Sequence, residues 1–179
     1  VEDKPENPQG GTAFVPQKES LSSTSFVPRI SPESIEAKSN YTLPEPARFE
    51  DGSVGWLFVD CIGLSAPVYE TDNEMEAMRI GIAHYKTTSA WDGNIGLCAH
   101  NGNAAYSYFR DLDKVKAGDE IRYETALGSR VYVVDSVREI GQTDWSMLSR
   151  TEDNRITLTT CIDGKPEHRL CVQARAKGV

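Results

Sequence analysis

The sequence predicts an all-β domain, either a sandwich or a closed barrel, that begins near residue 50. Short apolar or alternating runs recur beyond that point, and glycine-containing turn signals separate several of them. Only two short segments have helical character. We expect strands at 55–59, 66–69, 94–100, 120–124, 130–140, 156–161 and 169–174, and helical pieces at 74–79 and 145–148. Many strands joined by tight turns are typical of all-β folds.

Each element rests on a local signal. The first strand is a run of aromatic and aliphatic residues, and Pro67 makes the second an edge strand, because proline cannot donate to a ladder. Thr71-Asp72 and Thr143-Asp144 are helix caps before the two helical pieces. Turn signals at Gly118-Asp119 and 127–129 delimit the two middle strands. The remaining three strands alternate aliphatic with other residues.

Composition divides the 179 residues into two parts. Seven of the nine prolines lie in residues 1–50, whereas twelve of the fourteen glycines and all three tryptophans lie beyond. The first part is polar and lacks a sustained hydrophobic period, so it buries too little apolar surface to offset its ordering entropy. We therefore predict a flexible stalk or linker at 1–50 and a folded domain at 51–179.

Charge and cysteine usage exclude several classes of protein. The formal net charge is −8 and no Lys/Arg run stands out, which argues against a nucleic-acid or anionic-membrane partner. No stretch of 18 apolar residues is present, and Val1 in place of Met suggests that upstream sequence was removed. The four cysteines, at 61, 98, 161 and 171, form no CxxC metal pattern and permit two bridges without requiring them.

Three strands bring chemically reactive side chains to matching positions. Side chains alternate between the two faces of a strand, and aliphatic residues occupy one face of 95–100, 156–161 and 169–174. The opposite faces end with His100, Cys161 and Arg169 respectively. If the aliphatic faces fill the core, these three side chains point outward, where loops can build a groove.

These residues also carry a family resemblance. The run 157–161, Thr-Leu-Thr-Thr-Cys, followed eight residues later by Arg169, resembles the signature of the sortases. The segment 93–100 is similar to the histidine strand of that family, and its other motifs follow in the family's order at 109–112, 116–121 and 131–134. The resemblance covers roughly residues 54–176.

The resemblance implies a closed eight-stranded β-barrel with a few short helices and the roles of six residues. It makes Cys161 the nucleophile of a cysteine transpeptidase, His100 the general acid/base and Arg169 the stabiliser of substrate or oxyanion. Thiol, imidazole and guanidinium are the groups that acyl transfer through a thioester requires. Expected substrate contacts are Thr160, Ala99 and Asn101. No metal or cofactor is implied.

Substrates and location are likewise implied by the family. The donor would be a Leu-Pro-x-Thr-Gly-like sorting signal of a surface protein or pilin, cleaved before its final glycine. The acceptor would be the amine of a cell-wall precursor or a pilin lysine. The protein would act at the outer face of a Gram-positive cell membrane, anchored upstream of residue 1.

Several alternatives stay open within this reading. The Asp-Pro-aromatic lid tripeptide of pilin-polymerising sortases is absent, and 143–154 leaves little room for class B insertions, so a class D-like or unassigned type is preferred. The segment Leu43-Pro44-Glu45 resembles the opening of a sorting signal and could occupy the groove.

The other cysteines and an acidic cluster also leave alternatives open. Cys98 and Cys171 could be reduced thiols, they could form a disulfide, or they could take part in reversible oxidation with Cys161. The acidic residues Asp111, Asp113, Asp119 and Glu120 could form a calcium site or simply solvated turns.

Two other histidines and two other functions complete the alternatives. We expect His84 to be structural or to support the site, and His168 to face solvent. A non-transpeptidating cysteine peptidase and a catalytically silent peptide-binding β-barrel are the competing functions. Papain-like enzymes place their cysteine at a helix N-terminus ahead of the histidine, whereas here Cys161 ends a strand and follows His100.

Overall fold

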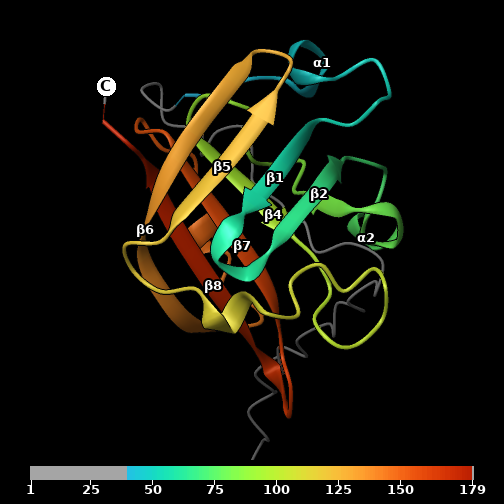
Figure 1. Cartoon of the computed structure of the whole chain (residues 1–179), viewed down its shortest axis with the longest axis vertical. Helices are drawn as coiled ribbons and strands as arrows, with labels where there is room; N and C mark the ends of the chain where they lie inside the picture. The colour runs from blue at the N-terminus through green and yellow to red at the C-terminus, as the bar shows by residue number, and fades with distance from the viewer. Residues whose placement is uncertain (1–39, 179) are drawn as a thin grey trace, which may run out of the picture.

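Eight strands close into a barrel in the computed structural model, which describes residues 40–178 (Figure 1). The order around the barrel is β1-β2-β3-β4-β7-β8-β6-β5. The strands are β1 (Gly55–Val59), β2 (Leu64–Tyr69), β3 (Ile82–His84), β4 (Asn94–Cys98), β5 (Glu120–Thr125), β6 (Gly128–Gly141), β7 (Arg155–Ile162) and β8 (Lys165–Ala176). The helical pieces are α1 (Pro44–Ala47), η2 (Asp60–Ile62), α2 (Glu74–Ile80), η3 (Leu112–Lys114) and η4 (Ser146–Leu148). The all-β prediction and the eight-stranded barrel are confirmed.

The sheet formed by β4, β7 and β8 is covered on both faces. Its inner face fills the barrel with aliphatic side chains, among them Leu97, Leu158 and Val172, all fully buried. Its outer face is covered by α2 and by the connection that contains η4, which together form a second apolar cluster. This explains why β4 and β7 have few charged residues, since neither of their faces meets solvent over most of its length.

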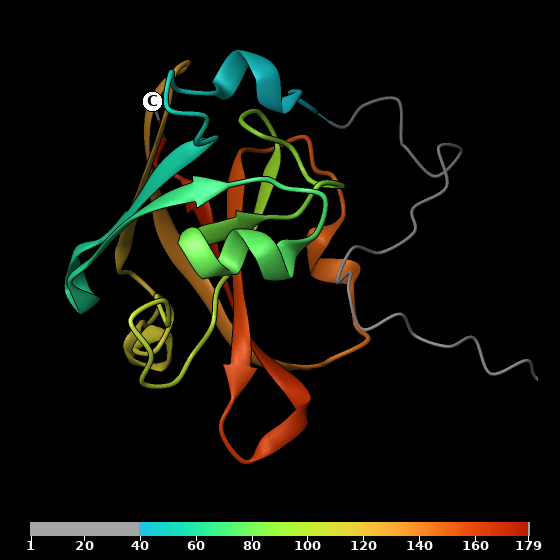
Figure 2. The same ribbon diagram turned by 90° about the vertical axis from the view of Figure 1, so that its right-hand side faces the viewer.

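Parallel pairing of β4 with β7 places the ends of both strands at the same edge of the sheet. The register runs from Asn94 opposite Arg155 to Cys98 opposite Thr159. On its other side β7 pairs with β8 in an antiparallel hairpin that extends beyond the barrel (Figure 2). The same view shows α2 in front of the sheet. The outward faces of β4, β7 and β8 therefore lie side by side where the hairpin leaves the barrel.

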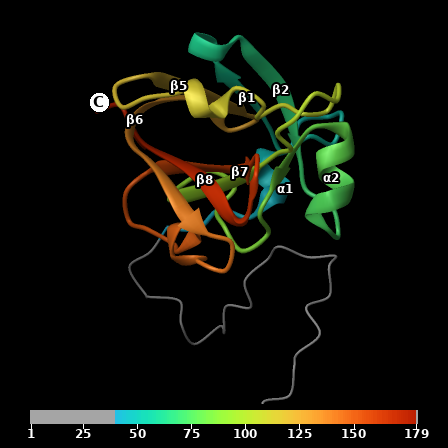
Figure 3. The same ribbon diagram turned by 90° about the horizontal axis from the view of Figure 1, so that it is seen from below.

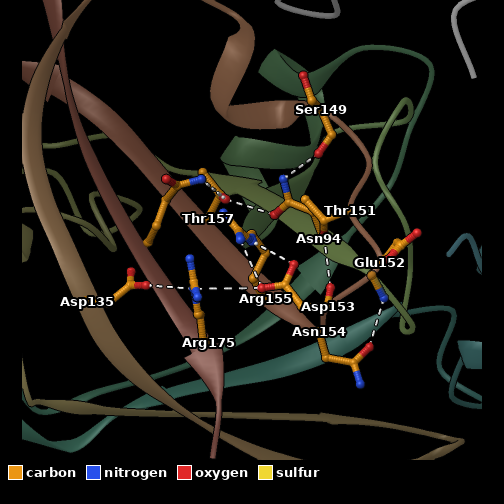
Figure 4. A network of polar contacts seen from close by, with 12 residues as sticks. Asn94, Asp135, Ser149, Thr151, Glu152, Asp153, Asn154, Arg155, Thr157 and Arg175 are labelled. Atoms are coloured by element: carbon orange, nitrogen blue, oxygen red, sulfur yellow. Dashed lines mark hydrogen bonds and ion pairs between the residues drawn. The ribbon is translucent and has the colours of Figure 1, made fainter. Parts of the chain in front are cut away.

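A polar network fixes the 142–154 connection over the outer face (Figure 4). The Asn94 amide donates to the carbonyls of Met147 and Ser149, each at 2.9 Å, and accepts from the Thr157 hydroxyl at 2.8 Å. Arg155 binds the Asp153 carboxylate with two nitrogens at the start of β7. Because the carbonyls of the connection are satisfied by side chains of the sheet, this segment packs as part of the domain.

Two local predictions are corrected. β2 is not an edge strand, since it has β1 on one side and β3 on the other. Pairing with β3 begins only at Val68, so the missing N–H of Pro67 interrupts no bond on that side. The cap of α2 is Asn73 rather than Thr71-Asp72, because the Asn73 side chain accepts from the Glu76 N–H at 2.9 Å.

The N-terminal segment 40–50 packs against the barrel, whereas the sequence placed the domain boundary after residue 50. The Asn40 N–H donates to the Thr151 carbonyl at 3.0 Å, the Ala126 N–H donates to the Ala47 carbonyl at 2.9 Å, and Pro44 is buried. Residues 1–39 of the predicted stalk lie outside the described residues. Within 40–178, no helix is long and apolar enough to cross a membrane.

The position of this segment excludes self-occlusion by Leu43-Pro44-Glu45. One of its partners, Thr151, lies just before the start of β7, whereas Cys161 lies near the end of that strand. Figures 1 and 2 show α1 and the β7–β8 hairpin at opposite ends of the molecule. An eight-residue strand spans roughly 25 Å, so the segment cannot reach a groove beside Cys161 from where it is held.

Candidate active site

The three predicted site residues line one pocket of about 180 Å³. Cys161 comes from β7, Arg169 from β8, and His100 from the segment that follows β4. Residues of α2, β7 and β8 contribute to its lining. Figure 3 shows these elements from below. The other lining residues are mainly apolar: Met75, Met78, Tyr85, Cys98, Ala99, Thr159 and Thr160.

Cys161 is exposed at the point where regular pairing of β7 with β8 ends. It lies opposite Arg169, and the register shifts at the next residue, where Ile162 pairs with Lys165. By strand alternation its side chain lies on the face opposite Ile156 and Leu158, which fill the barrel. Thr157 and Thr159 share the face of Cys161 but are buried, so only the last residue of this face is exposed.

His100 lies two residues past the end of β4 and is held against β7 by bonds outside the regular ladder. The Ala99 N–H donates to the Thr159 carbonyl at 3.4 Å, and the Thr160 hydroxyl donates to the Ala99 carbonyl at 2.8 Å. The Asn101 amide donates to the Cys161 carbonyl at 2.7 Å. The three residues expected to contact substrate therefore join the two strands, and two of them line the pocket.

The imidazole of His100 is partly buried, and this burial lowers its pKa below the ordinary value of 6.5. The Tyr106 ring meets it edge-on, with ring centroids 5.4 Å apart. The His100 carbonyl accepts from the Phe109 N–H at 3.0 Å, which ties the following loop to the same point. Burial thus favours the neutral form of the imidazole, which can accept a proton.

Arg169 is oriented by the hairpin on which it lies. Its Nη1 donates to the carbonyl of Pro166 at 3.0 Å and to that of His168 at 2.8 Å. These two bonds hold the guanidinium at the edge of the pocket, across β7–β8 from Cys161. A permanently charged, multidentate donor in that position can stabilise negative charge that develops near the thiol.

Cys98 and Cys171 are separate buried thiols. Both are free, and burial raises the pKa of Cys98 to about 12 and that of Cys171 to about 11. They lie on opposite sides of Thr159, each paired with it, so one whole strand separates them. Two strand spacings amount to about 9.6 Å, more than the ~7 Å that a disulfide spans between Cα atoms. The disulfide alternative is wrong.

The other candidate residues have structural partners. His84 is buried between the Glu70 carboxylate at 2.8 Å and the Ser89 carbonyl at 2.9 Å, and His168 is exposed beside Glu139. Of the acidic residues considered for calcium, three pair with lysines: Asp111 with Lys114, Asp119 with Lys116 and Glu120 with Lys177. Among residues 40–178, no group of three His, Cys, Asp or Glu residues could hold a metal ion.

Four residues of the site were not predicted from the sequence. Met75 and Met78 of α2 and Tyr85 line the pocket, and Tyr106 packs on His100. The two methionines share a helix face at a spacing of three, which indicates a buried face but not what it covers. Tyr85 contacts Thr159, which lies 74 residues away in the chain, so its position could not be predicted from local sequence.

The barrel and the cysteine-containing pocket define the class of protein, and comparison with known proteins gives the family. The family model for the sortase domain matches residues 57–177, and the chain belongs to the sortase family. The family prediction made from the signature residues is confirmed.

Individual relatives show how far the similarity extends. The chain is 27% identical to sortase A of Listeria monocytogenes over 112 residues, which are 63% of this chain and 50% of that protein. It is 23% identical to sortase A of Staphylococcus aureus over 130 residues, 70% of this chain and 63% of that protein. The chain thus spans about half to three fifths of the length of these curated relatives. Among solved structures, sortase C1 of Streptococcus agalactiae matches with a TM-score of 0.66 and 26% identity, covering 72% of this chain and 69% of that one.

Proposed function

We propose that this protein is a cysteine transpeptidase that cleaves a Leu-Pro-x-Thr-Gly-like sorting signal and transfers the acyl part to an amine. The observation that carries the proposal is the convergence of Cys161, His100 and Arg169 on one pocket, from three strands or strand ends. Membership of the sortase family supports the same chemistry.

The first step forms a thioester. The Cys161 sulfur attacks the scissile carbonyl as its proton passes to the neutral imidazole of His100, and Arg169 donates to the oxygen that becomes negative. The peptide C–N bond then breaks, and the protonated His100 gives its proton to the departing amine. The lowered pKa of His100 favours the neutral imidazole, which has a free site for the thiol proton, and it makes the imidazolium a stronger acid towards the departing amine.

The second step releases the product. An incoming amine attacks the thioester carbonyl, His100 removes its proton, and the Cys161 sulfur leaves and is reprotonated. Water in place of the amine gives simple hydrolysis, the reaction of a non-transpeptidating cysteine peptidase. The acceptor is the amine of a cell-wall precursor or a pilin lysine.

The pocket beside the thiol supports a substrate with apolar side chains on the acyl side of the scissile bond. Met75 and Met78 give the pocket an adaptable apolar lining, to which Tyr85 adds an aromatic ring. Such a surface is compatible with the leucine and proline of the sorting signal. In this proposal the domain acts at the outer face of a Gram-positive cell membrane, held by an anchor upstream of residue 1.

The test is cleavage of a peptide library of Leu-Pro-x-Thr-Gly type in the presence of hydroxylamine, followed by mass spectrometry. The wild-type protein is expected to yield the hydroxamate, and Cys161→Ala to yield none. Cys61→Ala removes another exposed thiol, in η2, and serves as the matched control that retains activity. Hydroxamate formation by Cys161→Ala would overturn the assignment. Release of free acid alone would favour a peptidase, and binding without turnover would favour a silent peptide-binding barrel.

A further inference from the structure

Resting on the proposed function, we propose that Asn101 is a positioning residue that fixes the nucleophile Cys161 relative to His100. Asn101 directly follows His100 in the chain, and its side-chain amide donates to the backbone carbonyl of Cys161 at 2.7 Å. One side chain thus connects the segment that carries the imidazole to the peptide unit of the thiol. The contact differs from the role expected from the sequence, a direct contact with substrate.

The contact replaces a ladder bond that the sheet cannot supply. Regular pairing between β4 and β7 ends with Cys98 opposite Thr159, although β7 continues to Ile162. Beyond that pair the chain after β4 turns away to form the loop that follows His100. The Cys161 carbonyl would therefore lose its neighbour on the β4 side, and the Asn101 amide occupies that place.

Asn101 is itself held in position by the loop. The Ser107 hydroxyl donates to the Asn101 carbonyl at 3.3 Å, and the Phe109 N–H donates to the adjacent His100 carbonyl at 3.0 Å. Its side-chain amide is therefore attached to a backbone fixed at two successive carbonyls. This arrangement allows the amide to restrain Cys161 rather than simply follow it.

Cys161 is a position where such a restraint has a large effect. On the β8 side, its pairing with Arg169 is the last regular pair before the register shifts. The backbone of Cys161 is thus at the end of the ladder on both sides. Displacement of a reacting atom by about 1 Å can reduce a rate about a hundredfold, so loss of the restraint is expected to affect turnover strongly.

The experiment compares Asn101→Ala and Asn101→Asp with Asn103→Ala. Aspartate keeps the shape of asparagine but offers no N–H, whereas Asn103 is an exposed residue of the same loop and serves as the control. In peptide cleavage, both Asn101 variants should lose about ten- to a hundredfold in kcat, with KM within about twofold and a small change in Tm. Asn103→Ala should match the wild type.

A second readout does not depend on peptide turnover. In a Cys61→Ala background, Cys161 is the exposed thiol of the described residues, so iodoacetamide reports its reactivity against pH. The difference in alkylation profile between the wild type and His100→Ala measures how much the imidazole contributes to the reactivity of the Cys161 thiol. The Asn101 variants should approach the profile of His100→Ala, whereas Asn103→Ala should retain the wild-type profile.

Each outcome decides the proposal. A rise in KM alone would show that Asn101 contacts the substrate and would contradict a positioning role. An unchanged kcat together with an unchanged alkylation profile would also contradict a positioning role. If Asn101→Ala fails to fold, the isosteric Asn101→Asp variant carries the same test. If the wild type cleaves no peptide, the proposed function fails, while the alkylation profiles still decide whether Asn101 couples the thiol to the imidazole.

Discussion

Burial divides the four cysteines into chemically different groups. Cys98 and Cys171 lie under α2 and η4 with a raised pKa, so they remain protonated thiols at neutral pH. Cys161 is only two residues from Thr159, the partner of both, yet it is exposed because β7 has passed the covering elements. Solvent access therefore distinguishes Cys161 from the two buried sulfurs of the same sheet, since a reactive cysteine must be accessible.

The pKa of His100 gives a prediction at the scale of the single residue. Nuclear magnetic resonance should find its midpoint below 6.5, because burial disfavours the charged imidazolium. Tyr106→Ala removes the ring that packs on His100 and should raise the midpoint towards the ordinary value, whereas Tyr106→Phe should leave it low. A midpoint unchanged in Tyr106→Ala would show that the tyrosine does not shield the imidazole.

The sign of the linked stability follows from the same pKa. The unfolded chain binds the proton at a higher pH than the folded chain, so the contribution of His100 to folding stability is present above 6.5. That contribution is lost as the pH falls from 6.5 through the lower midpoint of the folded state. Replacement by glutamine should remove this part of the acid sensitivity of unfolding.

At the scale of elements, close packing fixes β4 beneath its neighbours. Gly96 lies in β4, and a Cβ atom there would come within 2.7 Å of the side chains of both Leu148 and Thr88. Leu148 belongs to η4, and the Thr88 hydroxyl accepts from the Gly96 N–H at 3.0 Å. The absence of a side chain at this position therefore allows the covering segments to reach the sheet.

Gly96→Ala should destabilise the domain by about 1–3 kcal/mol, because the extra methyl group must displace packed side chains. Gly141→Ala is the matched control, since no heavy atom lies within 4 Å of the Cβ position there. Urea unfolding of both variants measures the difference. Equal midpoints for the two proteins would show that the sheet and its cover are not in the tight contact described here.

Local patterns predicted the strands that carry the site, but not the features that depend on distant contacts. The alternation in β4, β7 and β8 was sufficient to place His100, Cys161 and Arg169 on the outward side. The three-residue strand β3 was missed because all its residues are buried and show no alternation. The contact of Asn101 with the Cys161 carbonyl was not predicted, because the two residues lie sixty positions apart in the chain.

At the scale of the whole molecule, the segment 40–50 belongs with the barrel despite its proline-rich composition. A scan for hydrophobic period assigns it to the stalk, since its two buried residues in α1, Pro44 and Ala47, form no repeating pattern. Its stability comes instead from contacts with three connections of the barrel, through Ser89, Ala126 and Thr151. Local sequence patterns do not predict such contacts, because the partners are far apart in the chain.

Removal of this segment should lower the stability of the domain. A chain that begins at residue 51 loses several backbone hydrogen bonds and the Tyr41–Arg150 stacking contact, in which the guanidinium lies 3.8 Å from the ring centroid. We expect a Tm about 5–10 °C below that of a chain that begins at residue 40. Calorimetry on both chains measures the effect, and coincident transitions would place the boundary after residue 50 as the sequence suggested.

The parallel pairing of β4 with β7 has a consequence for the synthesis of this protein. His100 and Cys161 are 61 residues apart and meet only when that pairing forms, and Arg169 comes from the last strand of all. Contacts of such long range are slow to form. In the proposed mechanism, a nascent or unfolded copy therefore holds the Cys161 sulfhydryl without its proton acceptor, and it cannot attack peptide bonds before the chain is complete and folded.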